Sequence, residues 1–134
     1  MAFTTETKFV EAAERRLGVR LPESFRQFLL RSNGGEIAVL DLDWDLNPVH
    51  DDSDRERNRR TAIDIVLETT SAREWAGFPQ NAVSIGSDGC GNHLIFLPDD
   101  ADSSTLRAAL YVWWHEGPEL QFVAEDFSVA FPGG

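Results

Sequence analysis

The 134-residue sequence contains one cysteine, Cys90, so the chain cannot form an internal disulfide. Its longest unbroken apolar run, residues 108–114, is seven residues, whereas a membrane-spanning helix needs roughly 20. The first residues lack the basic segment and apolar core of a secretory signal. These absences argue against a disulfide scaffold and a membrane protein, and we expect a soluble, cytoplasmic protein.

Positive charge is also scarce, above all in the second half of the chain. The formal net charge is −11, and after residue 60 only Arg73 and Arg107 stand against eleven Asp and Glu residues. Such a surface repels nucleic acid and anionic membranes, and it attracts basic proteins. Because many cytoplasmic proteins are acidic simply for solubility, charge alone does not name the partner.

Apolar material is plentiful. The chain has nine Phe and four Trp residues and is 42% hydrophobic. A chain of this length falls within the usual range of a single domain and can bury about two-thirds of its unfolded surface. No internal repeat, low-complexity tract or Pro/Ser-rich linker divides the sequence, so we expect one domain over residues 1–134.

The first third of the chain predicts two helices. Phe9, Ala13 and Leu17 recur at i, i+4 and i+8, which predicts a helix over residues 6–17. Gly18 ends this helix, and Pro22 opens a second one, over residues 22–32, at its first helical position.

A third helix is expected in the middle of the chain. Ser53 and Glu56 have the spacing of a capping box, which predicts a helix over residues 53–68. Its buried side chains are expected to be Ile63, Val66 and Leu67.

The remaining elements are strands and a short closing helix. The run at residues 106–114 is continuously apolar and predicts a central strand covered on both faces. Other strands are expected at residues 37–40, extending toward 42, at 83–85, 92–97 and 120–123, with a helix at 124–131. The predicted fold is α+β, with N-terminal helices packed on a largely antiparallel sheet and a short C-terminal helix.

Three alternating aspartates follow the first predicted strand. If that strand continues, Trp44 faces one side while Asp41, Asp43 and Asp45 face water. A calcium loop is excluded here, because Leu46 stands where an EF-hand requires glycine. The three carboxylates therefore form either a solvated edge or a docking surface for a basic partner.

The glycine-rich turn at residues 86–91 is interpreted as a hairpin loop. A phosphate-binding loop leads into a helix and carries a lysine or a dinucleotide pattern, and this segment has neither. Asp88 and Asn92 are expected to bind turn amides. Cys90 has only His93 as a nearby base and no third group to orient it, so we expect no catalytic pair.

Several motifs occur in a characteristic order. Residues 17–25 read Leu-Gly-Val-Arg-Leu-Pro-Glu-Ser-Phe, residues 33–35 Asn-Gly-Gly, and residues 85–92 Ile-Gly-Ser-Asp-Gly-Cys-Gly-Asn. With the aromatic run at residues 112–116, this arrangement resembles the SUKH superfamily, whose founding members include fungal cell-wall assembly regulators. The resemblance extends over residues 5–131 and implies a SUKH-like domain.

The resemblance also implies a function. Bacterial SUKH-like proteins are widely associated with polymorphic toxin systems, where they act as immunity proteins that bind and block a cognate toxin, often a nuclease. Nucleases that grip phosphates tend to be basic, so an acidic inhibitor fits this role. The expected mechanism is occlusion, with no enzyme activity, catalytic residue, cofactor or metal. The fungal relatives suggest the alternative, a regulatory scaffold that docks on a cellular partner.

Charge and expected exposure select the candidate partner-binding residues, because the superfamily shares no binding motif that applies here. The candidates are Asp41, Asp43, Trp44, Asp45, Asp51, Asp52, Asp99, Asp100 and Asp102. The expected partner is a toxin domain or another protein, with no nucleic acid and no membrane, and the chain is expected to be a monomer or weak dimer. A small enzyme or metal protein built on the aspartate loops ranks last, because no nucleophile, base and orienter can be assembled.

Overall fold

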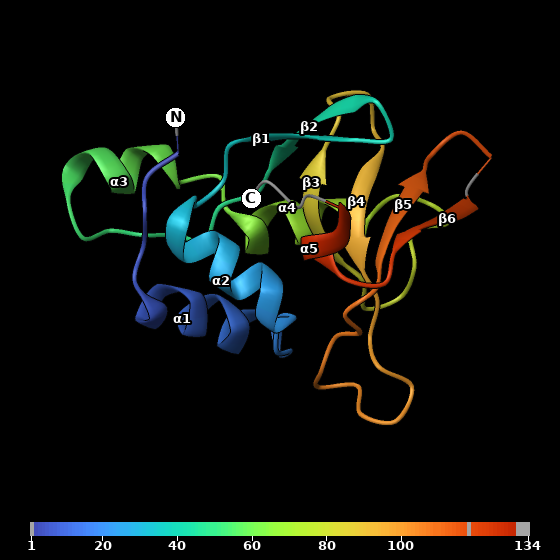
Figure 1. Cartoon of the computed structure of the whole chain (residues 1–134), viewed down its shortest axis with the longest axis horizontal. Helices are drawn as coiled ribbons and strands as arrows, with labels where there is room; N and C mark the ends of the chain where they lie inside the picture. The colour runs from blue at the N-terminus through green and yellow to red at the C-terminus, as the bar shows by residue number, and fades with distance from the viewer. Residues whose placement is uncertain (1, 118, 131–134) are drawn as a thin grey trace.

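The computed structural model describes residues 2–117 and 119–130, which form five helices and six strands. The helices are α1 (Thr7–Leu17), α2 (Glu23–Arg31), α3 (Arg55–Arg60), α4 (Ile65–Ala72) and α5 (Phe127–Ala130). The strands are β1 (Glu36–Val39), β2 (Leu42–Leu46), β3 (Val83–Ser87), β4 (His93–Phe96), β5 (Leu110–Trp114) and β6 (Glu119–Ala124). The predicted α+β class is confirmed (Figure 1).

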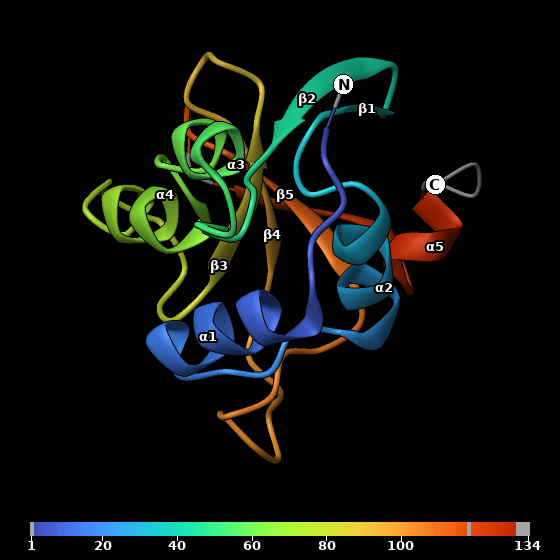
Figure 2. The same cartoon turned by 90° about the vertical axis from the view of Figure 1, so that its left-hand side faces the viewer.

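The six strands form one curled antiparallel sheet in which each strand pairs with the next along the chain. This order places β1 and β6 at the two edges of the sheet. Figure 2 shows α1 and α2 in front of the sheet and α4 beside β3. The predicted hairpin at the glycine-rich turn is the β3–β4 pair.

The main core fills the space between α1, α2 and one face of the sheet. Its centre is aromatic, because Phe25 packs edge-to-face on Phe96 and Phe127, with ring centroids 5.5 and 5.1 Å apart. Trp44 and Leu94 add fully buried side chains from β2 and β4. Burying a large side chain of this kind contributes about 1.5–3 kcal/mol, so these contacts fix the helices on the sheet.

A second, smaller cluster covers the opposite face of the sheet. Ile95 and Trp113 pack there against Ala72, the last residue of α4, and against Phe78 in the connection after α4. On β5, Val112 belongs to the main core while the adjacent Trp113 belongs to this cluster. The prediction of a central strand covered on both faces is therefore confirmed for β5.

The Asn-Gly-Gly motif connects α2 to β1 and to the chain beyond β2. The Asn33 amide donates to the Val49 carbonyl at 2.9 Å and accepts from the Val49 N–H at 2.8 Å. Gly34 and Gly35 have φ values of +105° and +87°, which side-chain-bearing residues rarely adopt. The motif therefore stops the helix and ties residue 49 to its end.

The third predicted helix is wrong in its extent. The chain forms two helices, α3 and α4, because Asp64 accepts a hydrogen bond from the Leu67 N–H and starts a new helix there. Asp54, not Ser53, caps α3. Ile63 and Leu67 are 63% and 49% exposed, so their predicted burial is also wrong.

Other element boundaries move for similar local reasons. The predicted strand at residues 37–42 ends at Val39, because Leu40 and Asp41 take positive φ values and reverse the chain. The strand predicted at 106–114 begins at Leu110. The closing helix begins at Phe127, since Ala124 belongs to β6, and the end predicted at residue 131 lies outside the described residues. α2 begins at Glu23, so Pro22 is its N-cap rather than its first residue.

Candidate functional site

The β1–β2 hairpin carries the aspartates that the sequence singles out. Its two-residue turn consists of Leu40 and Asp41, with φ values of 55° and 60°. Positive φ at both central residues is typical of the type I′ turn, which matches the twist of the flanking strands. The turn therefore projects Asp41, which is exposed, at the tip of the hairpin.

The register of the hairpin gathers carboxylates on its outer face. Glu36 lies opposite Asp45, and Ala38 lies opposite Asp43. All four residues are exposed, whereas Trp44 and Leu46, which alternate with the aspartates, are buried. The prediction that Asp43 and Asp45 point away from Trp44 is confirmed. We call Glu36, Asp41, Asp43 and Asp45 the acidic hairpin face.

The carboxylates of the acidic hairpin face have no compensating cation among the residues that the structure describes. Within the part of the chain that the structure describes, no ion pair or side-chain hydrogen bond reaches any of the four. Glu36 in particular is placed against a like charge, an arrangement that destabilises a sheet by up to about 1 kcal/mol. A basic surface brought against this face would relieve that repulsion.

Acidic residues elsewhere in the chain are mostly engaged in local structure. Glu56 pairs with Arg59 and Arg60, and Asp64 pairs with Arg16 at 3.3 Å. Arg57 pairs with Asp54 at 2.7 Å. Arg57, Arg59 and Arg60 of α3 are therefore paired with carboxylates of the same helix or of its N-cap. The acidic hairpin face differs because its charge is left for solvent or a partner.

Trp44 is a buried part of the hairpin's support. Its side chain is 0% exposed, and its indole N–H donates to the Val39 carbonyl at 3.0 Å. Its ring lies 6.2 Å from that of Trp114 on β5. A partner on the surface cannot touch Trp44 directly, but this side chain holds the strand that presents Asp43 and Asp45.

Asp51 is also buried, at 1% exposure. It accepts hydrogen bonds from the Thr5 hydroxyl at 2.6 Å and from the Ser53 N–H at 2.9 Å. Burial by itself would raise the pKa of Asp51, but the hydrogen bonds from Ser53 and Thr5 outweigh it, so this pKa lies below its ordinary value. Asp51 ties the N-terminal segment to the loop before α3 and has no free surface for a partner.

Asp52 is exposed but lies away from the hairpin strands. It lines a hollow of about 210 Å³ beside Phe9, Arg16 and Asp64. Arg16, His50, Asp52 and Asp64 all line this hollow, so it does not extend the acidic hairpin face as a surface of one sign.

The acidic loop between β4 and β5 forms a separate feature. The Asp99 carboxylate accepts the Ala101 N–H, and Asp100 pairs with Arg107 at 3.2 Å. Asp102 accepts the Ser104 hydroxyl at 2.6 Å, which lowers the pKa of Asp102 below its ordinary value. In both Figure 1 and Figure 2 this orange loop lies at the opposite end of the molecule from the β1–β2 turn. The structure does not join Asp99, Asp100 and Asp102 to the acidic hairpin face.

The glycine-rich turn is held by its own side chains. Asp88 accepts the backbone N–H of Cys90 at 2.8 Å and that of Asn92 at 3.2 Å, so its predicted role in the turn is confirmed. The Asn92 side chain instead donates to the Asp88 carboxylate at 2.8 Å and accepts from the His115 N–H at 3.0 Å. His93 points into the sheet, where its Nδ1 lies 2.7 Å from the Ser84 hydroxyl. Cys90 is exposed, and His93 is therefore not its base.

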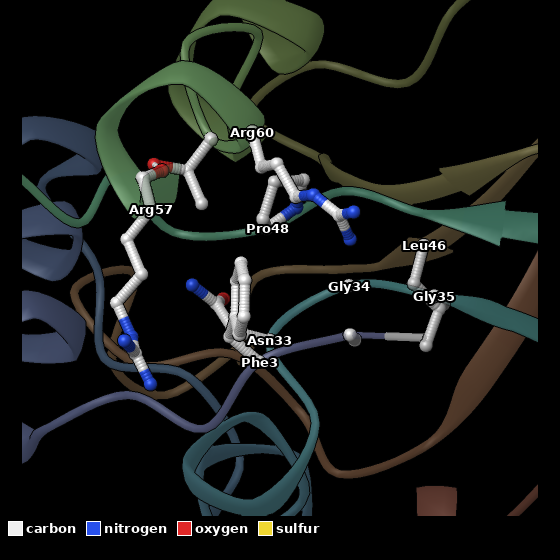
Figure 3. A pocket seen from close by; sticks show the side chains of 10 residues that line it. Phe3, Asn33, Gly34, Gly35, Leu46, Pro48, Arg57 and Arg60 are labelled. Atoms are coloured by element: carbon white, nitrogen blue, oxygen red, sulfur yellow. Dashed lines mark hydrogen bonds between the residues drawn. The ribbon is translucent and has the colours of Figure 1, made fainter. Parts of the chain in front are cut away.

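No sequence pattern predicts the pocket between the N-terminal segment, the Asn-Gly-Gly motif and α3. Its volume is about 290 Å³. Figure 3 shows Phe3 between the side chains of Arg57 and Arg60, whose guanidinium carbons lie 4.6 and 5.1 Å from the ring centroid. Both arginines also pair with carboxylates, Arg57 with Asp54 and Arg60 with Glu56. The pocket is therefore close to neutral and anchors Phe3.

Neither a metal-binding cluster nor a membrane-spanning helix occurs among the described residues. No group of three or more His, Cys, Asp or Glu side chains is arranged to hold a metal ion within residues 2–117 and 119–130. None of the described helices has the length and apolar character to cross a membrane.

The sheet is a curled antiparallel meander with helices packed against both of its faces and an acidic hairpin at one edge. The model of the SMI1 / KNR4 family (SUKH-1) matches residues 5–131. The chain belongs to this family, so the resemblance inferred from the sequence motifs is confirmed. Among the curated proteins compared with the sequence, none matches it.

Proposed function

We propose that this chain is an immunity protein that binds a cognate toxin domain and occludes it, the toxin being a basic, nuclease-type enzyme. Membership of the SUKH-1 family supports a role in protein binding. The observation that carries the proposal is the acidic hairpin face, whose four carboxylates lack any cation among the described residues. Basic residues that hold phosphates in a nuclease would complement this face.

The inhibition works by occupation of the toxin's surface and needs no turnover or cofactor. Asp41, Asp43 and Asp45 lie on one hairpin supported by Trp44, so its backbone presents their carboxylates together to a partner. Charge of this kind accelerates association and makes it sensitive to salt. Asp52 and the loop with Asp99, Asp100 and Asp102 are secondary candidates, because they lie outside the hairpin.

The test is a calorimetric titration of the toxin domain encoded beside this chain's gene. We expect one-to-one binding that weakens when salt rises from about 0.1 M to about 1 M, where the Debye length falls from about 10 Å to about 3 Å. Replacing Asp43 and Asp45 together by asparagine should weaken binding about tenfold or more. Lack of binding at low salt would contradict the proposal.

A matched control separates a local surface from general charge. Glu11 and Glu74 are exposed acids outside the hairpin, and replacing both by glutamine changes the net charge by the same amount. If this control weakens binding as much as the hairpin variant, the acidic hairpin face is not the site.

The alternative function is a regulatory scaffold that docks on a cellular partner through the same face. The uncompensated carboxylates suit any basic protein partner, so they favour this role as much as the first. A toxin gene beside this one supports immunity, and its absence supports the scaffold. In either role we propose that the free chain is a monomer or weak dimer.

A further inference from the structure

The edge strand β6 has a main chain that is open to another strand. Among the described strands, β6 pairs only with β5. An edge strand carries N–H and C=O groups that lack a partner on its outer side. Residues 119–122 of β6 are all exposed, so no described segment covers them. The first part of β6 is therefore a free template for strand pairing.

The side chains of β6 at residues 119–122 divide into an apolar row, Leu120 and Phe122, and a polar row, Glu119 and Gln121. Leu120 lies opposite Trp113 and is 44% exposed, and Phe122 lies opposite Tyr111 and is 55% exposed. The Tyr111 and Phe122 rings are in edge contact, with centroids 5.8 Å apart. Leu120 and Phe122 therefore extend the apolar cluster around Trp113 to the edge of the sheet, where it stays open.

The other face of β6 is polar and acidic. Glu119 lies opposite Trp114, and the Gln121 side-chain carbonyl accepts the Trp114 indole N–H at 2.9 Å. Glu116 and Glu125 flank the strand and are exposed, and residues 108–134 contain no Lys or Arg at all. A strand added beside β6 would therefore meet apolar groups on one face and negative charge on the other.

The usual protection of an exposed edge is incomplete here. Natural sheets commonly guard such edges with lysine, proline or a bulge. β6 contains no lysine or proline, and its only irregularity is the register shift that leaves Val123 without a partner between Phe122 and Ala124. The bulge ends the free segment at residue 122 but leaves residues 119–122 open.

We propose that β6 takes up an extended segment of the partner protein, in which apolar and basic residues alternate. Its apolar side chains would lie beside Leu120 and Phe122, and its basic side chains beside Glu119. Main-chain hydrogen bonds supply affinity in such strand addition, and alternate side chains supply specificity. The β6 strand of a second copy cannot supply the basic side chains, because residues 119–124 contain no Lys or Arg.

The proposal rests on the proposed function in that the partner is basic, and it is tested with synthetic peptides. The probe is a blocked peptide of alternating Lys and Val, about eight residues long. One control peptide keeps the alternation with Glu in place of Lys. A second has the same composition with all Lys residues before all Val residues. The readouts are affinity by fluorescence polarisation and chemical-shift changes of the backbone amides.

We expect the alternating Lys peptide to bind at least tenfold more tightly than either control and to shift the amides of residues 119–122. If the second control bound as tightly as the alternating Lys peptide, net charge alone would explain the affinity, and strand addition would be overturned. Shifts confined to β1 and β2 would overturn β6 as the site.

A pair of variants tests the site directly. Phe122→Lys places a positive charge in the apolar row and should weaken peptide binding at least tenfold. Ile63→Lys makes the same change at a residue that is 63% exposed between α3 and α4. Equal loss in both variants would contradict the proposal. A concentration-dependent dimer in sedimentation that Phe122→Lys abolishes would instead assign β6 to a second copy.

Failure of strand addition and failure of the proposed function give different results. If the toxin binds, loses affinity on hairpin substitution and ignores Phe122→Lys, the toxin does not use β6 and the proposed function stands. If the toxin does not bind but the peptide shifts β6, strand addition stands and the immunity role does not.

Discussion

Glu36 lies directly opposite Asp45 across the β1–β2 hairpin, and both side chains are exposed. Opposed like charges on neighbouring strands destabilise a sheet, whereas an opposite pair stabilises it. Selection for stability alone would not favour two carboxylates at directly opposed positions. Its presence in the acidic hairpin face, at the end far from the turn, is consistent with a surface whose cations come from a partner.

Replacing Asp45 by asparagine is expected to stabilise the free chain. Removal of one charge ends the repulsion with Glu36, which should raise the free energy of unfolding by about 0.2–1 kcal/mol at low salt. The gain should shrink at about 1 M salt, because exposed charges are then screened. Urea unfolding at both salt concentrations measures this difference. Glu11→Gln is the control, and an equal gain there would remove the special status of the Glu36–Asp45 pair.

Trp44 should act on the hairpin through packing. Trp44→Ala removes a fully buried ring and the indole bond to the Val39 carbonyl, so we expect a loss of about 3–5 kcal/mol in the free energy of unfolding. Trp75 is 51% exposed, and Trp75→Ala should stay within about 1 kcal/mol. Thermal or urea unfolding tests the contrast. Similar losses in both variants would mean that Trp44 does not hold β2 as described.

Local signals predicted much of this fold. Gly18 marks the end of α1, with φ of +76°, and the glycine-rich turn joins β3 to β4. Glycine adopts positive φ values that other residues avoid, so its position in the sequence alone predicts where such a turn lies. The break between α3 and α4 was not evident from the sequence. Asp64 lies inside the helix predicted over residues 53–68, and only the structure shows that its side chain caps a new helix.

The candidate site was predicted in part for the same reason. Alternation along one strand places Asp43 and Asp45 on the face opposite Trp44. The pairing of Glu36 with Asp45 depends on the register, which is set by a turn that contains neither Gly nor Asn. The exposure of β6 depends on the order of strands in the sheet, and no local pattern in residues 119–124 reveals that order.

The Asn33 side chain should be worth several kcal/mol. Asn33→Ala would leave both the N–H and the carbonyl of buried Val49 without these partners, and each unsatisfied group costs about 1–3 kcal/mol. We therefore expect a loss of about 2–6 kcal/mol in the free energy of unfolding. Asn58→Ala, at an exposed position, is the control and should change it by less than about 1 kcal/mol. Urea denaturation gives both values, and a small effect at Asn33 would contradict its role as a tie.

His93 should make the fold sensitive to mild acid. It is buried beside the Ser84 hydroxyl, and burial lowers the pKa of His93 below its ordinary value of 6.5, with a smaller opposing effect from Asp88 and a smaller lowering effect from His115. The unfolded chain therefore binds a proton near pH 6.5 that the folded chain does not. Stability is fully present above that pH and falls as the pH drops below it toward the folded-state pKa.

The measurement is the free energy of unfolding from urea denaturation between about pH 8 and about pH 5, a range that lies largely above the titration of carboxylates. His93→Gln removes the titrating group, so its stability should change less with pH over this interval even if the variant is less stable throughout. The difference between the two profiles isolates His93 from every other group. Parallel profiles would show that His93 gains no protonation difference on folding, and the buried contact with Ser84 would then have no part in acid sensitivity.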